Sequence, residues 1–138
     1  MQSLHFSTEQ PHEMVNITAR VQEIVTQSGV RRGLCVIHAP HTTAGITIQE
    51  GFDPDVTRDL LVALEKLAPR QGDYRHAEGN SDAHIKALLT GSSQTLPIEY
   101  GKVQLGRWQA VFFCEYDGPR SRSVWVQIIA DSNGESNA

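Results

Sequence analysis

Residues 108–128 read WQAVFFCEYDGPRSRSVWVQI, and this stretch decides the fold class. Apolar side chains take alternate positions on both sides of a central turn, at Trp108, Ala110, Phe112, Cys114, Tyr116, Val124, Val126 and Ile128. A period of two is typical of strands that pack one face against a core. Asp117, Gly118 and Pro119 between the two halves have the composition of a tight turn. The stretch therefore predicts a strand, a turn and a returning strand.

Further strands and three helices are expected upstream of this pair. The strands are expected at residues 2–6, 13–17, 33–39, 44–49 and 96–100. The helices are expected from Thr18 to Gly29, from Asp53 to Ala68 and from Asn80 or Ser81 to Gly91, because capping residues and glycines mark these bounds. Strands of antiparallel type mixed with a few helices predict an α+β domain.

The last two helices each carry apolar residues at helical spacing. In the second helix these are Val56, Leu60, Leu64 and Leu67, and in the third they are Ile85, Leu88 and Leu89. Residues at this spacing share one face of a helix. We expect the three apolar residues of the third helix to face inward.

The length of 138 residues, 39% of them hydrophobic, fits one ordinary domain. We expect this domain at residues 1–130 and a flexible polar tail at residues 131–138. Cys35 and Cys114 lie in apolar runs, which favours buried, reduced thiols.

The net charge of −4 predicts no general attraction for nucleic acid or for an anionic membrane. No apolar run approaches the roughly 20 residues that span a bilayer, and the first residues lack the pattern of a signal peptide. We therefore expect a cytoplasmic protein without nucleic-acid or membrane partners.

Three histidines form the candidate metal site. His41 follows a predicted strand, His76 lies in a predicted loop and His84 lies in a predicted helix. Neutral imidazoles bind zinc and related ions, and three ligands leave a position open for water or substrate. The alternative is that these are ordinary hydrogen-bonded histidines, since their separation matches no short zinc motif.

Carboxylates near the histidines are candidate catalytic groups. Glu78 lies between His76 and His84, and Asp53 follows His41 along the chain. A carboxylate beside metal-bound water can act as a general base or orient a ligand histidine. Asp53 also fits the structural role of a helix cap, which does not exclude a second role.

Four other residues are candidate substrate-binding groups. Asn80 opens a helix whose free amides can hold a phosphate. Arg120 and Arg122 lie two residues apart and project from one face of an extended chain, so their guanidinium groups could clamp a phosphate. The alternative for both is an ion pair with Glu115 or Asp117. Trp108 could stack on a ring of the substrate, although the strand pattern favours a place in the core.

Three long segments are similar to the YjbQ family, whose members are described as secondary thiamine-phosphate synthase-like proteins. They are PHTTAGITIQEGFDPDVTRDLL at 40–61, DYRHAEGNSDAHIKALLTGSSQTLPI at 73–98 and LGRWQAVFFCEYDGPRSRSV at 105–124. The resemblance implies a compact α+β fold, with a mixed or antiparallel β-sandwich or a partly open barrel and about three helices. It also implies a homotrimer and a metal site shared by His41, His76 and His84.

The resemblance further implies a transferase that joins a pyrimidine diphosphate to a thiazole phosphate. Zinc suits a three-histidine site, whereas Mg²⁺ is the usual partner of a diphosphate leaving group. Two alternatives stay open. One is a metal-dependent hydrolase or lyase that acts on a small phosphorylated metabolite. The other is a metal-binding module without catalytic activity.

Overall fold

The computed structural model describes residues 1–132, which form two antiparallel sheets and three helices. The strands are β1 (Gln2–Ser7), β2 (Glu13–Asn16), β3 (Gly33–His38), β4 (Ala44–Glu50), β5 (Ser93–Glu99), β6 (Lys102–Val103), β7 (Gln109–Glu115) and β8 (Ser121–Ala130). The helices are α1 (Thr18–Ser28), α2 (Pro54–Leu67) and α3 (Ser81–Thr90). The predicted α+β class is confirmed, and the predicted strands and helices lie close to their expected bounds.

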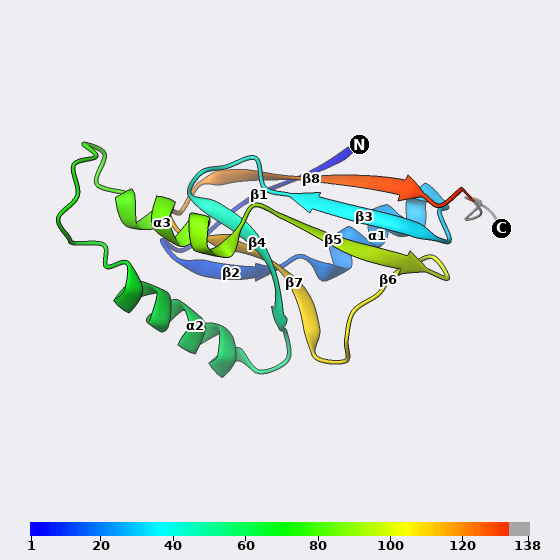
Figure 1. The fold of residues 1–138 in the computed structure, drawn as a ribbon, viewed down its shortest axis with the longest axis horizontal. Helices are drawn as coiled ribbons and strands as arrows, with labels where there is room; N and C mark the ends of the chain where they lie inside the picture. Colours follow the sequence, from blue (N-terminus) through cyan, green and yellow to red (C-terminus); the bar gives the residue numbers. More distant parts are fainter. Residues whose placement is uncertain (133–138) are drawn as a thin grey trace.

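One sheet has the strand order β1-β8-β3-β5-β6, and the other has the order β2-β7-β4 (Figure 1). The main core lies between these sheets and α1, with Val21, Val25, Ile37, Phe113 and Val126 among its fully buried side chains. The strand that carries the first half of the quoted stretch, β7, is the centre of the smaller sheet.

Both faces of β7 are buried, so the expectation of one packed face is wrong for this strand. Val111 and Phe113 face the main core, whereas Ala110, Phe112 and Cys114 belong to a second apolar cluster that includes Ala83 and Ala87 of α3. The α3 helix covers the outer face of the small sheet and buries the second set. Cys35 and Cys114 are both buried and free, as expected.

The inward face of α3 differs from the prediction. Leu88 and Leu89 are exposed by 80% and 56%, and Ile85 is exposed too. The buried residues of this helix are Asp82, Ala83, Lys86 and Ala87. Small alanines let the helix approach the sheet closely, and Gly45 of β4 allows the same approach, since a Cβ there would lie 2.5 Å from the Gly91 carbonyl oxygen.

The α2 helix begins as predicted at Asp53 and Pro54, and no residue in its described length is fully buried. Leu61 and Leu64 are partly buried against the second cluster, but Leu67 is 73% exposed. The expected apolar face is therefore only partly covered by the described residues. Figure 1 shows α2 and α3 together on one side of the molecule, and β6 and the C-terminal end of β8 on the other.

The fifth predicted strand ends one residue early. Tyr100 does not continue the alternation of Leu96 and Ile98. It lies in a tight turn with a φ of 54°, followed by Gly101 with a φ of 74°, and this turn joins β5 to the short strand β6. Two central residues with positive φ are typical of a type I′ hairpin turn.

Two further features concern the end of the described chain and the lengths of the helices. The β8 strand ends at Ala130, and the Asp131 amide donates to the Arg32 carbonyl oxygen at 3.0 Å. Residues 133–138 of the expected flexible tail lie outside the described residues. Within the described part of the chain, every helix is too short or too polar to cross a bilayer.

Candidate active site

A polar cleft of about 500 Å³ lies where the β3–β4 loop, the start of α3 and the start of β8 meet. Six of the predicted site residues line it; these six are His41, Glu78, Asn80, His84, Arg120 and Arg122. His38, Thr43 and Asp117, which the sequence did not single out as site residues, line it as well. Segments far apart in the sequence therefore bring three histidines, two carboxylates, an amide and two guanidinium groups to one cleft.

His41 is held at this cleft through its Nε2 atom. That nitrogen lies 3.0 Å from the Ser123 amide nitrogen and 3.1 Å from the Ser123 carbonyl oxygen, so it can accept from one or donate to the other. Burial lowers the pKa of His41 below its ordinary value of 6.5, and the nearby Arg122 lowers it further. The ring is therefore neutral near pH 7.

The donating tautomer of His41 leaves Nδ1 free to bind an ion. In that state the Nε2 proton has the Ser123 carbonyl oxygen as its acceptor, which is the usual second partner of a metal-bound imidazole. This geometry fits the predicted role of His41.

His76 and His84 lie beside each other, with ring centroids 5.5 Å apart and planes nearly perpendicular. His76 comes from the irregular loop before α3, and its Nε2 lies 3.7 Å from a carboxylate oxygen of Glu78. These rings can approach one ion from two sides. Among the described residues of one subunit, however, the group whose ligand atoms all lie within 4.8 Å of one another is His12, Glu65 and Asp82, and not the three predicted histidines.

Arg122 and Glu115 form a buried ion pair that joins the two sheets. Arg122 Nε donates to Glu115 Oε1 at 2.8 Å, and its Nη2 donates to Glu115 Oε2 and to Thr43 Oγ1. Burial alone would raise the pKa of Glu115, but hydrogen bonds from Arg122, Thr8 and the Asp117 amide lower it below its ordinary value. The pair that the sequence offered as an alternative to phosphate binding is present, and it is buried, not at the surface.

Arg120 is paired with Asp117 at the rim of the cleft. Its Nε donates to the Asp117 carbonyl oxygen, and its Nη2 donates to the Asp117 carboxylate, each at 2.8 Å. Burial opposes ionisation of Asp117, yet hydrogen bonds from Asn80 and Arg120 lower its pKa below the ordinary value. About half of the Arg120 side chain is exposed, so this guanidinium can also reach a ligand in the cleft.

Asn80 has one atom with no partner in the described structure. Its Nδ2 donates to Asp117 Oδ2 at 2.8 Å, whereas its buried Oδ1 accepts no hydrogen bond from any described residue. A buried amide oxygen without a donor costs free energy, so this position favours an additional donor, either a water or a group of a bound molecule.

His76, Asp53 and Trp108 do not line this cleft, although His76 lies beside His84, which does. The Asp53 carboxylate accepts from the Asp55 amide at 2.9 Å and caps α2, which is the structural role that the sequence favoured. Trp108 is 54% exposed, so the expectation of a core position is wrong. Its ring lies 5.6 Å from the Phe52 ring between centroids, and the Arg107 guanidinium lies over it at 4.8 Å. Trp108 comes just before β7, whereas Glu115 is the last residue of that strand, so the two residues lie at opposite ends of β7.

No sequence pattern indicated that a buried cluster forms around Lys86. The Lys86 ammonium donates to Glu65 at 2.6 Å, to Asp82 at 2.8 Å and to His12 Nε2 at 3.0 Å. It thus stands among the three residues that would otherwise group as metal ligands. Asp82 lies one turn earlier on the same helix, whereas His12 and Glu65 come from distant segments that only the fold brings next to Lys86.

Comparison with known proteins identifies relatives over nearly the whole chain. Residues 2–131 match the family described as UPF0047 protein YjbQ-like. The UPF0047 protein of Methanocaldococcus jannaschii is 49% identical over 90% of each chain, and YugU of Bacillus subtilis is 40% identical over 94% of this chain and 98% of its own.

Solved structures agree with these sequence matches. A YjbQ/UPF0047-family protein of Clostridium acetobutylicum has a TM-score of 0.92 with 53% identity, covering 94% of this chain and all of its own. A YbjQ-like protein of unknown function from Sulfolobus solfataricus has a TM-score of 0.90 with 31% identity, covering 94% of this chain and 96% of its own. The chain therefore belongs to the UPF0047 (YjbQ-like) family.

Proposed function

We propose that this protein is a metal-dependent enzyme that acts on a small phosphorylated substrate in the polar cleft. The candidate reaction is a transfer of thiamine-phosphate synthase type, in which a thiazole phosphate displaces the diphosphate of a pyrimidine diphosphate. A bond forms between the pyrimidine and thiazole parts, and diphosphate is released. The observation that carries the proposal is the meeting of His41, His84, Glu78 and Arg120 in one cleft of about 500 Å³. This set combines two imidazoles that can bind a metal ion, a carboxylate and a phosphate-binding group.

His41, His76 and His84 would hold the divalent ion, with zinc as the best match for three imidazoles. When bound, such an ion stabilises negative charge on a phosphate or diphosphate oxygen. Mg²⁺, which prefers oxygen ligands, would instead enter with the diphosphate of the substrate. The neutral state of His41 near pH 7 and the 5.5 Å separation of the other two rings support this assignment.

The other cleft residues would bind and orient the substrate. Arg120, exposed by about half, can exchange part of its pairing with Asp117 for a phosphate oxygen. Arg122 is already bound to Glu115 and Thr43, so it would hold the cleft wall in place and lend positive potential. Asn80 would supply its unpaired Oδ1 to a donor on the substrate or to an ordered water.

The activity test uses zinc-loaded and magnesium-supplemented protein with the pyrimidine diphosphate and the thiazole phosphate. We expect coupled product from the wild type, and a loss of at least about tenfold in kcat/KM for Arg120→Lys, which keeps the charge but loses the planar fork. Arg107→Lys is the matched control, because Arg107 lies by Trp108 outside the cleft. If product forms equally well with both variants, the cleft is not the site of this reaction.

The second candidate is hydrolysis or elimination on a small phosphorylated metabolite. The exposed carboxylate of Glu78, 3.7 Å from His76, supports it, because a carboxylate beside a metal ligand can accept a proton from water. Release of inorganic phosphate or of an unsaturated product, with no coupled product, would favour this class over the transferase.

We also propose that the protein assembles as a homotrimer. Exposed apolar residues on the side of α2 and α3 support an interface there; they are Phe52, Leu67, Leu88, Leu89 and Trp108. Large exposed apolar side chains that lie near one another are typical of protein–protein contacts.

A further inference from the structure

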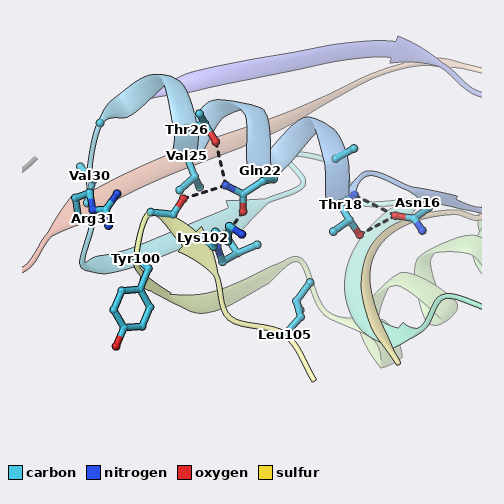
Figure 2. A pocket seen from close by; sticks show the side chains of 14 residues that line it. Asn16, Thr18, Gln22, Val25, Thr26, Val30, Arg31, Tyr100, Lys102 and Leu105 are labelled. Carbon is cyan, nitrogen blue, oxygen red and sulfur yellow. Dashed lines mark hydrogen bonds between the residues drawn. The ribbon is translucent and has the colours of Figure 1, made fainter. Parts of the chain in front are cut away.

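A second groove lies away from the polar cleft, between α1 and the β5–β6 hairpin. It measures about 950 Å³ and is lined by helix residues from Thr18 to Gly29 and by hairpin residues from Tyr100 to Leu105. Figure 2 shows this groove with Gln22 near its centre, Arg31 toward one end and Asn16 toward the other. None of the residues that carry the proposed function line it.

The groove is held open by a fixed polar contact. Gln22 Nε2 donates to the Gly101 carbonyl oxygen at 3.0 Å and to Thr26 Oγ1 at 3.1 Å, and its Oε1 accepts from the Val103 amide at 3.0 Å (Figure 2). This glutamine therefore ties the hairpin to the helix with all of its hydrogen-bonding atoms in use. A preformed groove of this kind needs little reorganisation to receive a ligand.

The charged side chains that line the groove are all positive. Its lining includes Arg31 and Lys102 and no carboxylate, although the whole chain has a net charge of −4. Within residues 1–132, neither side chain takes part in an ion pair or a hydrogen bond. Two uncompensated cations at the mouth of one groove favour an anionic occupant.

The free hydrogen-bonding groups also match an anion. The acceptors Gln22 Oε1, Thr26 Oγ1 and Asn16 Oδ1 are all occupied by partners within the protein. Asn16 Nδ2, the Arg31 guanidinium and the Lys102 ammonium remain as donors with no partner in the described chain. An occupant rich in acceptors would satisfy these donors, whereas a cation or a donor-rich molecule would not.

Apolar walls lie beside these donors. Val25 and Val30 are buried, and Val103 and Leu105 are partly buried against the main core. Tyr100 stands at the rim with 78% exposure and a positive φ, in a turn position that asparagine or glycine usually takes. A large ring that is exposed and held in an unfavoured backbone conformation indicates a functional role, and contact with a ligand is the role that this position favours.

We propose that this groove binds a small anionic molecule with an apolar or aromatic body, at a second site distinct from the polar cleft. Arg31 and Lys102 take the phosphate or carboxylate group, and Val103, Leu105 and Tyr100 contact the body of the molecule.

The test is a titration of the full chain with phenyl phosphate, followed through backbone amide chemical shifts. We expect saturable shifts at Arg31, Gly101, Lys102 and Val103, and weaker binding of inorganic phosphate and of benzyl alcohol. Arg31→Gln and Lys102→Gln should each weaken phenyl phosphate binding by about threefold, and the double variant by about tenfold. Lys66→Gln on α2 is the matched control and should bind like the wild type.

Three results would overturn the proposal. The first is that phenyl phosphate shifts only amides of the polar cleft, such as those of Thr42 and Asn80. The second is that inorganic phosphate binds as tightly as phenyl phosphate, which would show that the apolar wall contributes nothing. The third is that phenyl phosphate fails to bind the wild type, while Arg31→Glu combined with Lys102→Glu changes the oligomeric state in light scattering, which would show that the groove is a contact between copies of the chain.

Discussion

Lys86 is a lysine with no exposed surface, and its ammonium donates to three side chains from different segments. Replacement by methionine would keep much of the volume and leave the buried carboxylate of Asp82 without its partner. We expect Lys86→Met to lower the free energy of unfolding by about 3 kcal/mol. Glu65→Gln is the control, since Glu65 is nearly half exposed, and it should cost about 0–1 kcal/mol. Urea unfolding of both variants measures the difference, and equal losses would show that burial of the pair does not matter.

His12 makes the stability of this cluster depend on pH. Burial lowers its pKa below 6.5 and Lys86 lowers it further, while Asp82 and Glu65 act in the opposite direction. The unfolded chain therefore binds the proton more readily, so stability is present above pH 6.5 and is lost as the pH falls through the lowered pKa of the folded state. We expect unfolding free energies measured between pH 7.5 and about 5 to decline less in His12→Gln than in the wild type. Parallel declines would remove His12 as a cause.

At the scale of the element, Gly45 determines how closely α3 approaches β4. An added Cβ would lie 2.5 Å from the Gly91 carbonyl oxygen and 2.9 Å from Thr90 Cγ2, and the backbone oxygen cannot move without displacing the end of the helix. We expect Gly45→Ala to cost about 2–3 kcal/mol. Gly79→Ala introduces a side chain into open space at a φ of 76° and should cost only about 1 kcal/mol. Thermal unfolding compares them, and a larger loss for Gly79→Ala would contradict this packing.

The elements themselves could be predicted well from sequence. Alternation identified β7 and β8, and Asp53 with Pro54 identified the start of α2, because these signals are local. The sequence could not predict which face of each helix is buried, because the burial of Lys86 depends on partners from other segments that only the fold brings next to it. Leu88 is exposed although it fits the apolar pattern.

The same distinction holds for the candidate site. Spacing and family motifs selected residues that do share the cleft, among them His41, His84 and Arg120. They could not exclude Trp108 from the site, although it does not line the cleft. Trp108 belongs to the same motif but lies just before β7, whereas Glu115, the partner of Arg122, lies at the other end of that strand. Nor could they show that Arg122 is already bound by Glu115. Motifs group residues by sequence, and the strand direction decides which of them meet.

For the whole molecule, the exposed apolar residues of α2 and α3 are the proposed trimer contact. We expect light scattering of the wild type at micromolar concentration to give three times the chain mass of 15.3 kDa. Leu88→Glu should shift the equilibrium toward smaller species, because a charge placed in an apolar interface is costly to bury. Lys66→Glu, at an exposed polar position of α2, is the control. A wild-type monomer would contradict the proposed assembly.

The central claim is that His41, His76 and His84 together hold a divalent ion at the polar cleft. Calorimetric titration of metal-free protein with Zn²⁺, paired with X-ray absorption of the loaded sample, tests it most directly. We predict one ion per chain with nitrogen ligands at about 2.0–2.1 Å, and loss of binding in His41→Asn, His76→Asn and His84→Asn. His12→Gln should bind the ion like the wild type. Undiminished binding in the variants of His41, His76 and His84, or its loss in His12→Gln alone, would contradict the account.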